Sequence, residues 1–189
     1  MEKIEIERSK VCRVERAGAL DISLRKLFQD PRKIVGPFVK EGMTVFDLGC
    51  GPGFFTIEMA KRVGSAGKVV AVDLQEGMLE IVKGKIRNTN LQDIIELHKC
   101  QSDKIGLSIT ADFILIFYML HEVPNQSSFL KEVHGLLKPN GKVLIVEPKF
   151  HVTKDDFKKY RELLKEIGFG IVEEPNVFFS RSFLINKIA

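Results

Sequence analysis

Tryptophan is absent from this 189-residue sequence, tyrosine occurs only twice and cysteine three times, and no apolar run is long. Cys12, Cys50 and Cys100 are odd in number and lie outside any CxxC pattern, so they fit neither a disulfide framework nor a zinc site, and we expect no bound metal. The longest apolar run covers residues 113–120, whereas a helix that crosses a bilayer needs about 20 apolar residues. We therefore expect neither a transmembrane helix nor a membrane partner.

An excess of charge of one sign is also missing. The net charge is +4, and acidic and basic residues are interleaved along the chain, which disfavours a dedicated nucleic-acid binder. Residues 1–8 are charged and lack the apolar centre of a signal peptide, so we expect a cytoplasmic protein. The length predicts one domain over residues 1–189.

From residue 44 onward, short β-rich apolar runs alternate with helical patterns, which predicts βαβ units and a mostly parallel sheet. The predicted strands cover residues 44–48, 68–73, 94–99, 112–118 and 142–147. The predicted helices cover residues 54–63, 76–87, 125–138 and a segment from Thr153 to about Gly168, and Asn140-Gly141 is expected to turn the chain into the fifth strand.

Both ends of the chain differ from this pattern. Apolar residues 171–172 and 183–185 are too close for a crossover helix, so we expect an antiparallel pair at one edge of the sheet. Short helices are predicted at residues 20–28 and from Asp30-Pro31 onward, where Asp30 is a suitable cap and Pro31 suits the first helical position. Residues 1–43 thus form a helical extension that is a candidate cover for a ligand.

The join between the first strand and the first helix of this pattern is rich in glycine, and it reads Asp47-Leu48-Gly49-Cys50-Gly51-Pro52-Gly53-Phe54-Phe55. Such a loop brings backbone N–H groups and a helix terminus close to a ligand. A triphosphate site needs Lys-Ser or Lys-Thr after the last glycine, and the chain has Phe54-Phe55 there. A dinucleotide site needs G-x-G-x-x-G, so the glycine spacing disfavours NAD.

The seven positions Asp47 to Gly53 resemble motif I, D-x-G-x-G-x-G, of class I methyltransferases that use S-adenosylmethionine. The resemblance extends over residues 44–188. It implies a doubly wound, Rossmann-like α/β fold with three α-β-α layers, in which six strands are parallel and one, near an edge, is antiparallel. It also implies S-adenosylmethionine as cofactor and S-adenosylhomocysteine as product.

A second acid supports the resemblance, because Asp73 ends the next strand beyond the glycine loop. A carboxylate at this place can accept hydrogen bonds from both ribose hydroxyls, although Asp73 alone is equally suited to cap the following helix. In the resembled family Met78 packs on the adenine. Ser102 and Asp103 follow the third strand, where the family places the group that meets the adenine amino group; the alternative is a surface turn.

The cofactor-binding residues that the resemblance implies lie in four segments. They are Asp47, Gly49, Cys50, Gly51, Pro52, Gly53, Phe54, Phe55, Asp73, Leu74, Met78, Ser102, Asp103 and Phe117. Phe54 and Phe55, together with Tyr118, form either a wall around the methyl group or ordinary core, and both alternatives stay open. Cys50 has the position of a helix-terminal nucleophile, but we favour a structural role for it.

The segment 117–123, after the fourth strand, resembles the L-H-x-V segment of small-molecule methyltransferases. Within it His121 and Tyr118 are the candidate catalytic residues, because they follow the carboxyl end of a parallel strand and His121 titrates near neutrality. A structural role for His121 is the alternative, since positioning of the two reactants can dominate methyl transfer.

We therefore interpret the chain as a methyltransferase that passes a methyl group to a small-molecule acceptor by in-line displacement. A non-catalytic cofactor-binding or regulatory module is the alternative from a different class, and an RNA or protein methyltransferase is another. Base methylation is disfavoured because residues 117–120 lack the Asn-Pro-Pro-Tyr or Asp-Pro-Pro-Tyr motif. The sequence identifies neither the acceptor nor the oligomeric state.

Overall fold

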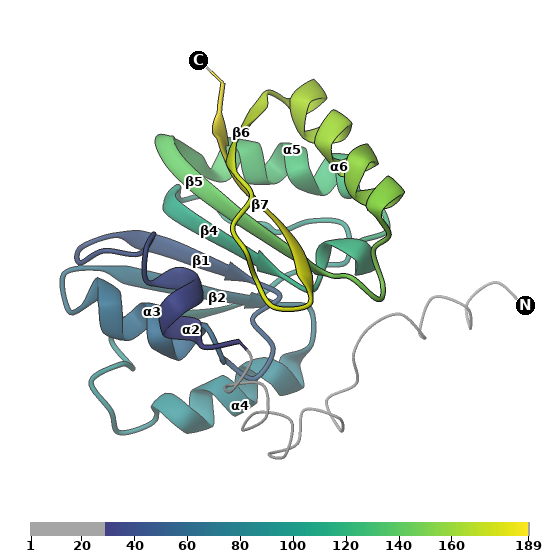
Figure 1. The fold of residues 1–189 in the computed structure, drawn as a ribbon. Helices are drawn as coiled ribbons and strands as arrows, with labels where there is room; N and C mark the ends of the chain where they lie inside the picture. The colour runs from purple at the N-terminus through teal and green to yellow at the C-terminus, as the bar shows by residue number, and fades with distance from the viewer. Residues whose placement is uncertain (1–28, 189) are drawn as a thin grey trace, which may run out of the picture.

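A computed structural model describes residues 29–188 (Figure 1). The helix predicted at residues 20–28, Cys12 and most of the predicted helical extension lie outside the described residues. Within them, seven strands form a single sheet in the order β3-β2-β1-β4-β5-β7-β6. The strands are β1 (Thr44–Leu48), β2 (Lys68–Asp73), β3 (Ile95–Lys99), β4 (Ala111–Phe117), β5 (Leu137–Pro148), β6 (Phe169–Glu173) and β7 (Ser180–Lys187).

The direction of the strands confirms the predicted topology. The pairs β1–β2, β1–β4, β2–β3 and β4–β5 are parallel, whereas β7 pairs antiparallel with both β5 and β6. Thus β7 alone runs against the other six strands and lies one place in from the edge.

Helices cover both faces of the sheet and complete three layers (Figure 1). The helices are α2 (Pro31–Val35), α3 (Thr56–Val63), α4 (Glu76–Ile86), α5 (Gln126–Leu136) and α6 (Lys154–Ile167), with a 3₁₀ turn η3 (Leu120–Glu122) after β4. Side chains of alternate strand residues point to opposite faces, which divides the core in two. One cluster joins α2, α3 and α4 to the sheet, and the other joins α5 and α6 to it.

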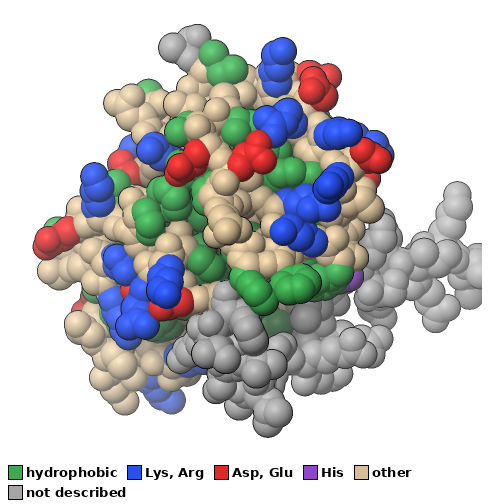
Figure 2. Space-filling view, in the orientation of Figure 1, with side chains coloured by type: hydrophobic (Ala, Val, Ile, Leu, Met, Phe, Trp, Pro, Cys, Tyr) green, Lys and Arg blue, Asp and Glu red, His purple; other side chains and the backbone are tan. Residues whose placement is uncertain are grey.

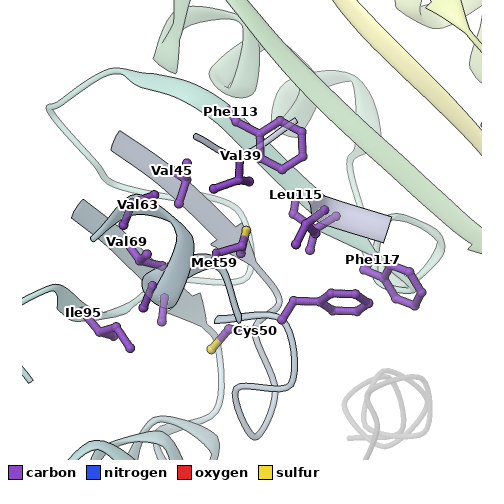
Figure 3. Packing of buried hydrophobic residues seen from close by; sticks show 14 of the residues in the cluster. Val39, Val45, Cys50, Met59, Val63, Val69, Ile95, Phe113, Leu115 and Phe117 are labelled. Atoms are coloured by element: carbon purple, nitrogen blue, oxygen red, sulfur yellow. The ribbon is translucent and has the colours of Figure 1, made fainter. Parts of the chain in front are cut away.

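The first cluster lies beneath the glycine loop. Met59 and Val63 of α3 pack over Val45 and Val69 of the central strands, and Cys50 lies at the border of the cluster (Figure 3). All four aliphatic side chains are fully buried. This packing fixes α3 against the sheet and so fixes the loop that leads into it.

The predicted helix caps are confirmed. The side chain of Asp30 accepts a hydrogen bond from the N–H of Arg32 at 3.0 Å, and Pro31 opens α2. Thr153 and Asp156 form a reciprocal capping box at the start of α6, and Gly168 ends that helix at φ +102°, in the left-handed region.

Several boundaries differ from the prediction, most of them by one or two residues, and two of the differences have a clear structural cause. Helix α3 starts at Thr56 rather than at Phe54, because the glycine loop continues through Phe55. Asn140-Gly141, where we expected a turn, lies inside β5. There a bulge shifts the register with β4: Ala111 pairs with Leu137, and Phe113 pairs with Lys142. A Cβ on Gly141 would lie 2.7 Å from the Leu137 side chain, so this close approach explains the glycine without a turn.

The topology places the site. The chain leaves β1 toward α3 on one face of the sheet and leaves β4 toward α5 on the other, so a crevice opens between the carboxyl ends of these neighbouring strands. The glycine loop follows β1, and Tyr118 and His121 follow β4. Both groups of candidate residues therefore lie at the same crevice.

Candidate active site

The three glycines of the loop have positive φ values but different surroundings. The φ angles of Gly49, Gly51 and Gly53 are +72°, +51° and +81°. A Cβ on Gly49 would lie 2.8 Å from the Met119 side chain, and one on Gly53 would lie 3.0 Å from Val82, whereas a Cβ on Gly51 would meet no atom within 4 Å. Gly49 and Gly53 thus allow close packing, and Gly51 faces open space where backbone can approach a ligand.

Backbone hydrogen bonds from β2 hold the loop in this shape. The N–H groups of Gly49 and Cys50 both donate to the Val72 carbonyl at 2.9 Å, and the N–H of Gly51 donates to Asp73 Oδ2 at 2.8 Å. The predicted pair of signals, the glycine loop and Asp73, is thus joined by a direct hydrogen bond.

Asp47 stabilises the glycine loop through a hydrogen bond to the start of α3. Its side chain is buried, and Oδ2 accepts a hydrogen bond from the Thr56 hydroxyl at 2.6 Å. This bond ties the end of β1 to the first residue of α3. The Pro52 carbonyl accepts a hydrogen bond from Lys85 of α4, which fixes the tip of the loop.

Asp73 is nearly buried and has the geometry of both roles predicted for it. Its Oδ1 accepts the N–H of Gln75, the cap residue of α4, at 2.9 Å. Each carboxylate oxygen has a second acceptor site, so these bonds leave capacity for ribose hydroxyls. Burial raises the pKa of Asp73, although the N–H groups of Gln75 and Gly51 oppose that shift. Nearby, Met78 is buried and Leu74 is exposed.

Ser102 and Asp103 lie in an exposed turn after β3. The backbone groups of Gln101 and Lys104 close this turn with reciprocal hydrogen bonds of 2.9 and 3.4 Å. The N–H of Cys100 donates to the Asp73 carbonyl at 3.1 Å, which places the turn beside the end of β2. The geometry is that of the surface turn, and a contact with adenine stays a prediction for these two residues.

Aromatic rings line the crevice between the loop and β4. The Phe55 and Phe117 ring centroids are 4.4 Å apart, and Phe117 and Tyr118 are separated by the same distance. Phe55 and Phe117 are buried in the first core cluster, while Phe54 and Tyr118 are half-buried against it. The inner rings therefore belong to the core, and the outer rings border the crevice.

The Cys50 side chain also belongs to the core. It is buried in the first cluster, and burial raises the pKa of its thiol, with the charges of Asp47 and Asp73 acting in the same direction. A thiol in these surroundings stays protonated and is a poor nucleophile. The structure thus supports the structural role that we favoured.

Tyr118 connects β4 to two distant parts of the chain. Its φ angle is +60°, a strained conformation for a bulky residue, and its N–H donates to the Val146 carbonyl at 2.8 Å. Gln29 Nε2 donates to its hydroxyl at 2.5 Å, and the hydroxyl of Ser180 lies 2.6 Å from it. These bonds hold Tyr118 at the carboxyl edge of the sheet.

His121 is hydrogen bonded to a fully buried carboxylate. Glu147 Oε2 pairs with His121 Nδ1, and Glu147 Oε1 accepts the N–H of Leu120 at 2.9 Å. Burial by itself lowers the pKa of His121, but the hydrogen bond and the charge of Glu147 outweigh it, so the pKa lies above the ordinary value. In neutral imidazole this arrangement puts the proton on Nδ1 and leaves the lone pair on Nε2.

Negative charge gathers around this histidine. Glu122 is half-buried, and its pKa is raised by burial and by the charges of Glu147 and Asp73, against the opposing effect of His121. Cationic groups are stabilised at such a place. The open backbone at Gly51, the buried Asp73 carboxylate and this negative field together fit S-adenosylmethionine, which has a ribose, a sulfonium and an amino group.

Several residues of this site were not found by motif. Gln29 and Ser180 bond to Tyr118, and Glu147, at the carboxyl end of β5, holds His121. Arg181 of β7 lies opposite Glu147 of β5 in the sheet. Among residues 29–188, Arg181 Nε is the one buried polar side-chain atom that has no hydrogen-bond partner. Short motifs carry no signal for these contacts, because they join residues far apart in the sequence.

Residues 29–188 contain no cluster of three or more His, Cys, Asp or Glu side chains placed to hold a metal ion. In the same part of the chain, no helix has the length and hydrophobicity that crossing a membrane requires.

A family model described as a methyltransferase domain matches residues 39–176. The chain belongs to this methyltransferase family. The match includes the glycine loop, Asp73 and the segment after β4, so it confirms the resemblance drawn from those residues.

Curated relatives of this methyltransferase domain include two bacterial proteins. It is 42% identical over 112 residues to a demethylmenaquinone methyltransferase of Lactobacillus johnsonii, a match that covers 58% of this chain and 45% of the relative. It is 33% identical over 135 residues to the Staphylococcus aureus protein of the same name, covering 70% and 55% of the two chains. The chain thus spans about half the length of the curated relatives it matches.

Solved structures agree on the fold. A SAM-dependent methyltransferase from Aquifex aeolicus has a TM-score of 0.83 and 28% identity, and the match covers 95% of this chain and all of that one. A protein from Methanococcus maripaludis described as a putative S-adenosyl-L-methionine-dependent methyltransferase has a TM-score of 0.76 and 21% identity, with 93% and 94% covered. The predicted seven-stranded, mostly parallel α/β sheet is confirmed.

Proposed function

We propose that this domain binds S-adenosylmethionine and transfers its methyl group to a small molecule that carries an acidic hydroxyl. The observation that carries the proposal is the hydrogen bond between Gly51 of the open loop and Asp73, at the crevice that Tyr118 and His121 also border. The loop backbone and Asp73 would hold the cofactor. Phe54 and Tyr118, the outer rings at the crevice, would line the position of the methyl group.

When bound, S-adenosylmethionine would supply an electrophilic methyl group on a sulfonium, and the leaving group, S-adenosylhomocysteine, would keep the electron pair of the carbon–sulfur bond. His121 would remove the hydroxyl proton of the acceptor with Nε2, while Glu147 holds the ring and stabilises the imidazolium that forms. Once its proton is on His121, the acceptor would have the electron pair that a bond to the methyl carbon requires.

The names of the relatives suggest the first acceptor to test. Demethylmenaquinone in its reduced form is a dihydroxynaphthalene, which has the acidic hydroxyl that a histidine base requires. We therefore place 1,4-dihydroxynaphthalenes first in an acceptor panel, followed by catechols and other phenols. The pairing of His121 with a buried carboxylate supports this choice over acceptors that react without a base.

Thermal unfolding in the presence of ligand tests the cofactor assignment. S-adenosylhomocysteine at a hundredfold excess over Kd should stabilise the protein by about 2.7 kcal/mol, and NAD at the same concentration should not. A melting temperature that responds to neither S-adenosylmethionine nor S-adenosylhomocysteine would contradict the assignment.

Turnover separates the enzyme from the non-catalytic module. The protein, S-adenosylmethionine and each acceptor are incubated, and S-adenosylhomocysteine is measured by chromatography. Release above the level without acceptor supports the enzyme. Cofactor binding with no release across the whole panel would favour a regulatory role.

A further inference from the structure

Two phenylalanine side chains are strongly exposed on adjacent loops at the carboxyl edge of the sheet. Phe150 follows β5 and is 73% exposed, and Phe179 precedes β7 and is 64% exposed. The N–H of Lys149 donates to the Phe179 carbonyl at 3.0 Å and so holds the two loops together. Hydrophobic side chains gather along the lower rim of the face in Figure 2, over the loop between β6 and β7. We call Phe150 and Phe179 the phenylalanine patch.

The backbone conformation of the loop before β7 keeps the Phe179 ring exposed. The φ angle of Phe179 is +52°, in the left-handed region that bulky residues rarely adopt. Ser180 fixes the turn, because its N–H donates to the Val177 carbonyl at 3.0 Å and its hydroxyl donates to the Phe178 carbonyl at 2.9 Å. The backbone at Phe179 is thus strained, and its large apolar ring is exposed to water. Strain combined with apolar exposure indicates an interaction surface.

Lysines surround the patch. Lys33 and Lys149 line, together with Phe179, an open cavity of about 540 Å³, and Lys154 begins α6 just beyond Phe150. Among residues 29–188, the ion pairs include none of these three lysines.

Two acidic side chains near the patch form ion pairs. Asp30 pairs with Arg32 at 3.0 Å, and Glu174 pairs with Arg161. The apolar rings are therefore bordered by positive charge, which complements an anionic surface.

The patch also adjoins the candidate catalytic residues. The Phe150 ring lies 4.8 Å from that of His151, which stacks on His121 at 5.1 Å. On the neighbouring loop, Ser180 lies within hydrogen-bond distance of the Tyr118 hydroxyl. A partner seated on the patch would thus lie at the entrance to the acceptor side of the crevice.

We propose that the phenylalanine patch docks this domain on the surface of an anionic lipid bilayer. Phenylalanine rings enter the boundary between headgroups and acyl chains, and lysines beside them interact with anionic headgroups. Such contact is peripheral and requires no spanning helix. Docking implies that the methyl acceptor enters the site from the bilayer. This implication rests on the proposed function, whereas the docking itself does not. The expectation of no membrane partner came from hydropathy, which gives no information on the exposure of single phenylalanines.

Vesicle sedimentation of the full chain tests the docking. Vesicles of phosphatidylcholine with about one-third phosphatidylglycerol should bind the protein, and pure phosphatidylcholine vesicles should bind it less. The double variant Phe150→Ser/Phe179→Ser should weaken binding at least about tenfold, because each ring no longer leaves water. Raising the salt concentration should weaken the binding of the unaltered protein.

The matched control is Ile109→Ser/Ile188→Ser. These side chains are 39% and 56% exposed, and they lie before β4 and after β7, at the opposite edge of the sheet. The control should sediment with vesicles like the unaltered protein. Titration with S-adenosylhomocysteine in the same preparations reports on the proposed function separately, since a failure of cofactor binding leaves the sedimentation result standing.

Four outcomes would overturn the docking. They are an unaltered protein that does not bind anionic vesicles, an equal loss in the control, a dimer in light scattering that the patch variant dissociates, and a patch variant whose melting temperature falls by several degrees. The third would assign the patch to a second copy of the chain. The fourth would assign it to packing that stabilises the fold.

Discussion

The two sides of the crevice are built differently. On the side of β1 and β2, backbone groups determine the geometry: Gly49, Cys50 and Gly51 all donate N–H groups to the end of β2. On the side of β4, β5 and β7, side chains determine it, since Tyr118 bonds to Ser180 and His121 bonds to Glu147. A site for a common cofactor can be held by backbone and a short motif, whereas the acceptor side depends on contacts that differ from one enzyme to another.

If residues on the acceptor side perform the chemistry, substitutions there should change the rate of methyl transfer most strongly. His121→Ala removes the proposed base, and we expect kcat to fall by about 10² to 10⁴ with an unchanged Kd for S-adenosylhomocysteine. Steady-state kinetics with a responsive acceptor, and calorimetry for the cofactor, check this. Asn125→Ala, which removes the cap of α5 in the following loop, is the control for local disturbance. A full rate in His121→Ala would leave positioning alone as the source of catalysis.

The pH dependence sharpens the same point. A base acts when deprotonated, so the rate should rise with pH through the raised pKa of His121. Glu147→Gln removes the charge that raises this pKa, so the rise should move to lower pH while the maximal rate falls. In folding, a raised histidine pKa stabilises the protein below the unfolded value of about 6.5, and the gain is lost as pH increases through the folded pKa. An unshifted pH–rate profile in Glu147→Gln would show that the His121–Glu147 pair does not control the reaction.

The cofactor side should respond in affinity instead of rate. Asp73→Ala removes the carboxylate that braces Gly51 and is placed for ribose, and we expect a Kd for S-adenosylhomocysteine about a hundredfold weaker, since hydrogen bonds to charged groups contribute about 1.5–3 kcal/mol each. Isothermal titration gives the affinity, and circular dichroism checks the fold. Glu96→Ala, on the exposed edge strand β3, should bind normally. Equal affinity in Asp73→Ala would exclude the ribose role.

The same division explains what could be predicted from the sequence. Strands β1 and β2 matched their predicted bounds because they are short apolar runs buried on both faces. The bulge that extends β5 back to Leu137 was missed, since Asn140-Gly141 is also typical of a turn. In the candidate site, the loop and Asp73 could be proposed from the sequence because their signals are local. Gln29, Ser180 and the partner of His121 could not, because side-chain contacts over 26 to 89 positions leave no short pattern.

Tyr118 tests whether the acceptor side is rigid. Tyr118→Phe keeps the ring but removes the hydroxyl that joins Gln29 and Ser180, so we expect the free energy of unfolding to fall by about 1 kcal/mol and Tm by about 2–4 °C. Scanning calorimetry measures both. The Kd for S-adenosylhomocysteine should stay within about threefold of the unaltered value, because the partners of the hydroxyl, Gln29 and Ser180, lie outside the glycine loop. An unchanged Tm would mean that water replaces these bonds at no cost.

Cys50 gives the smallest expected effect and the finest test of the comparison. It lies in the middle of the glycine loop, yet its side chain packs in the core and adds to the backbone bonds of the loop only a long contact, 3.5 Å from Sγ to the Gly51 carbonyl. Cys50→Ala should therefore reduce the free energy of unfolding by about 1 kcal/mol through lost packing, with kcat and cofactor Kd within about threefold of the unaltered protein. Because burial raises the pKa of the thiol, iodoacetamide should modify Cys50 only after unfolding. A large loss of rate with normal cofactor binding would show that a side chain of the loop takes part in the chemistry, and the division between a backbone-built cofactor side and a side-chain-built acceptor side would fail.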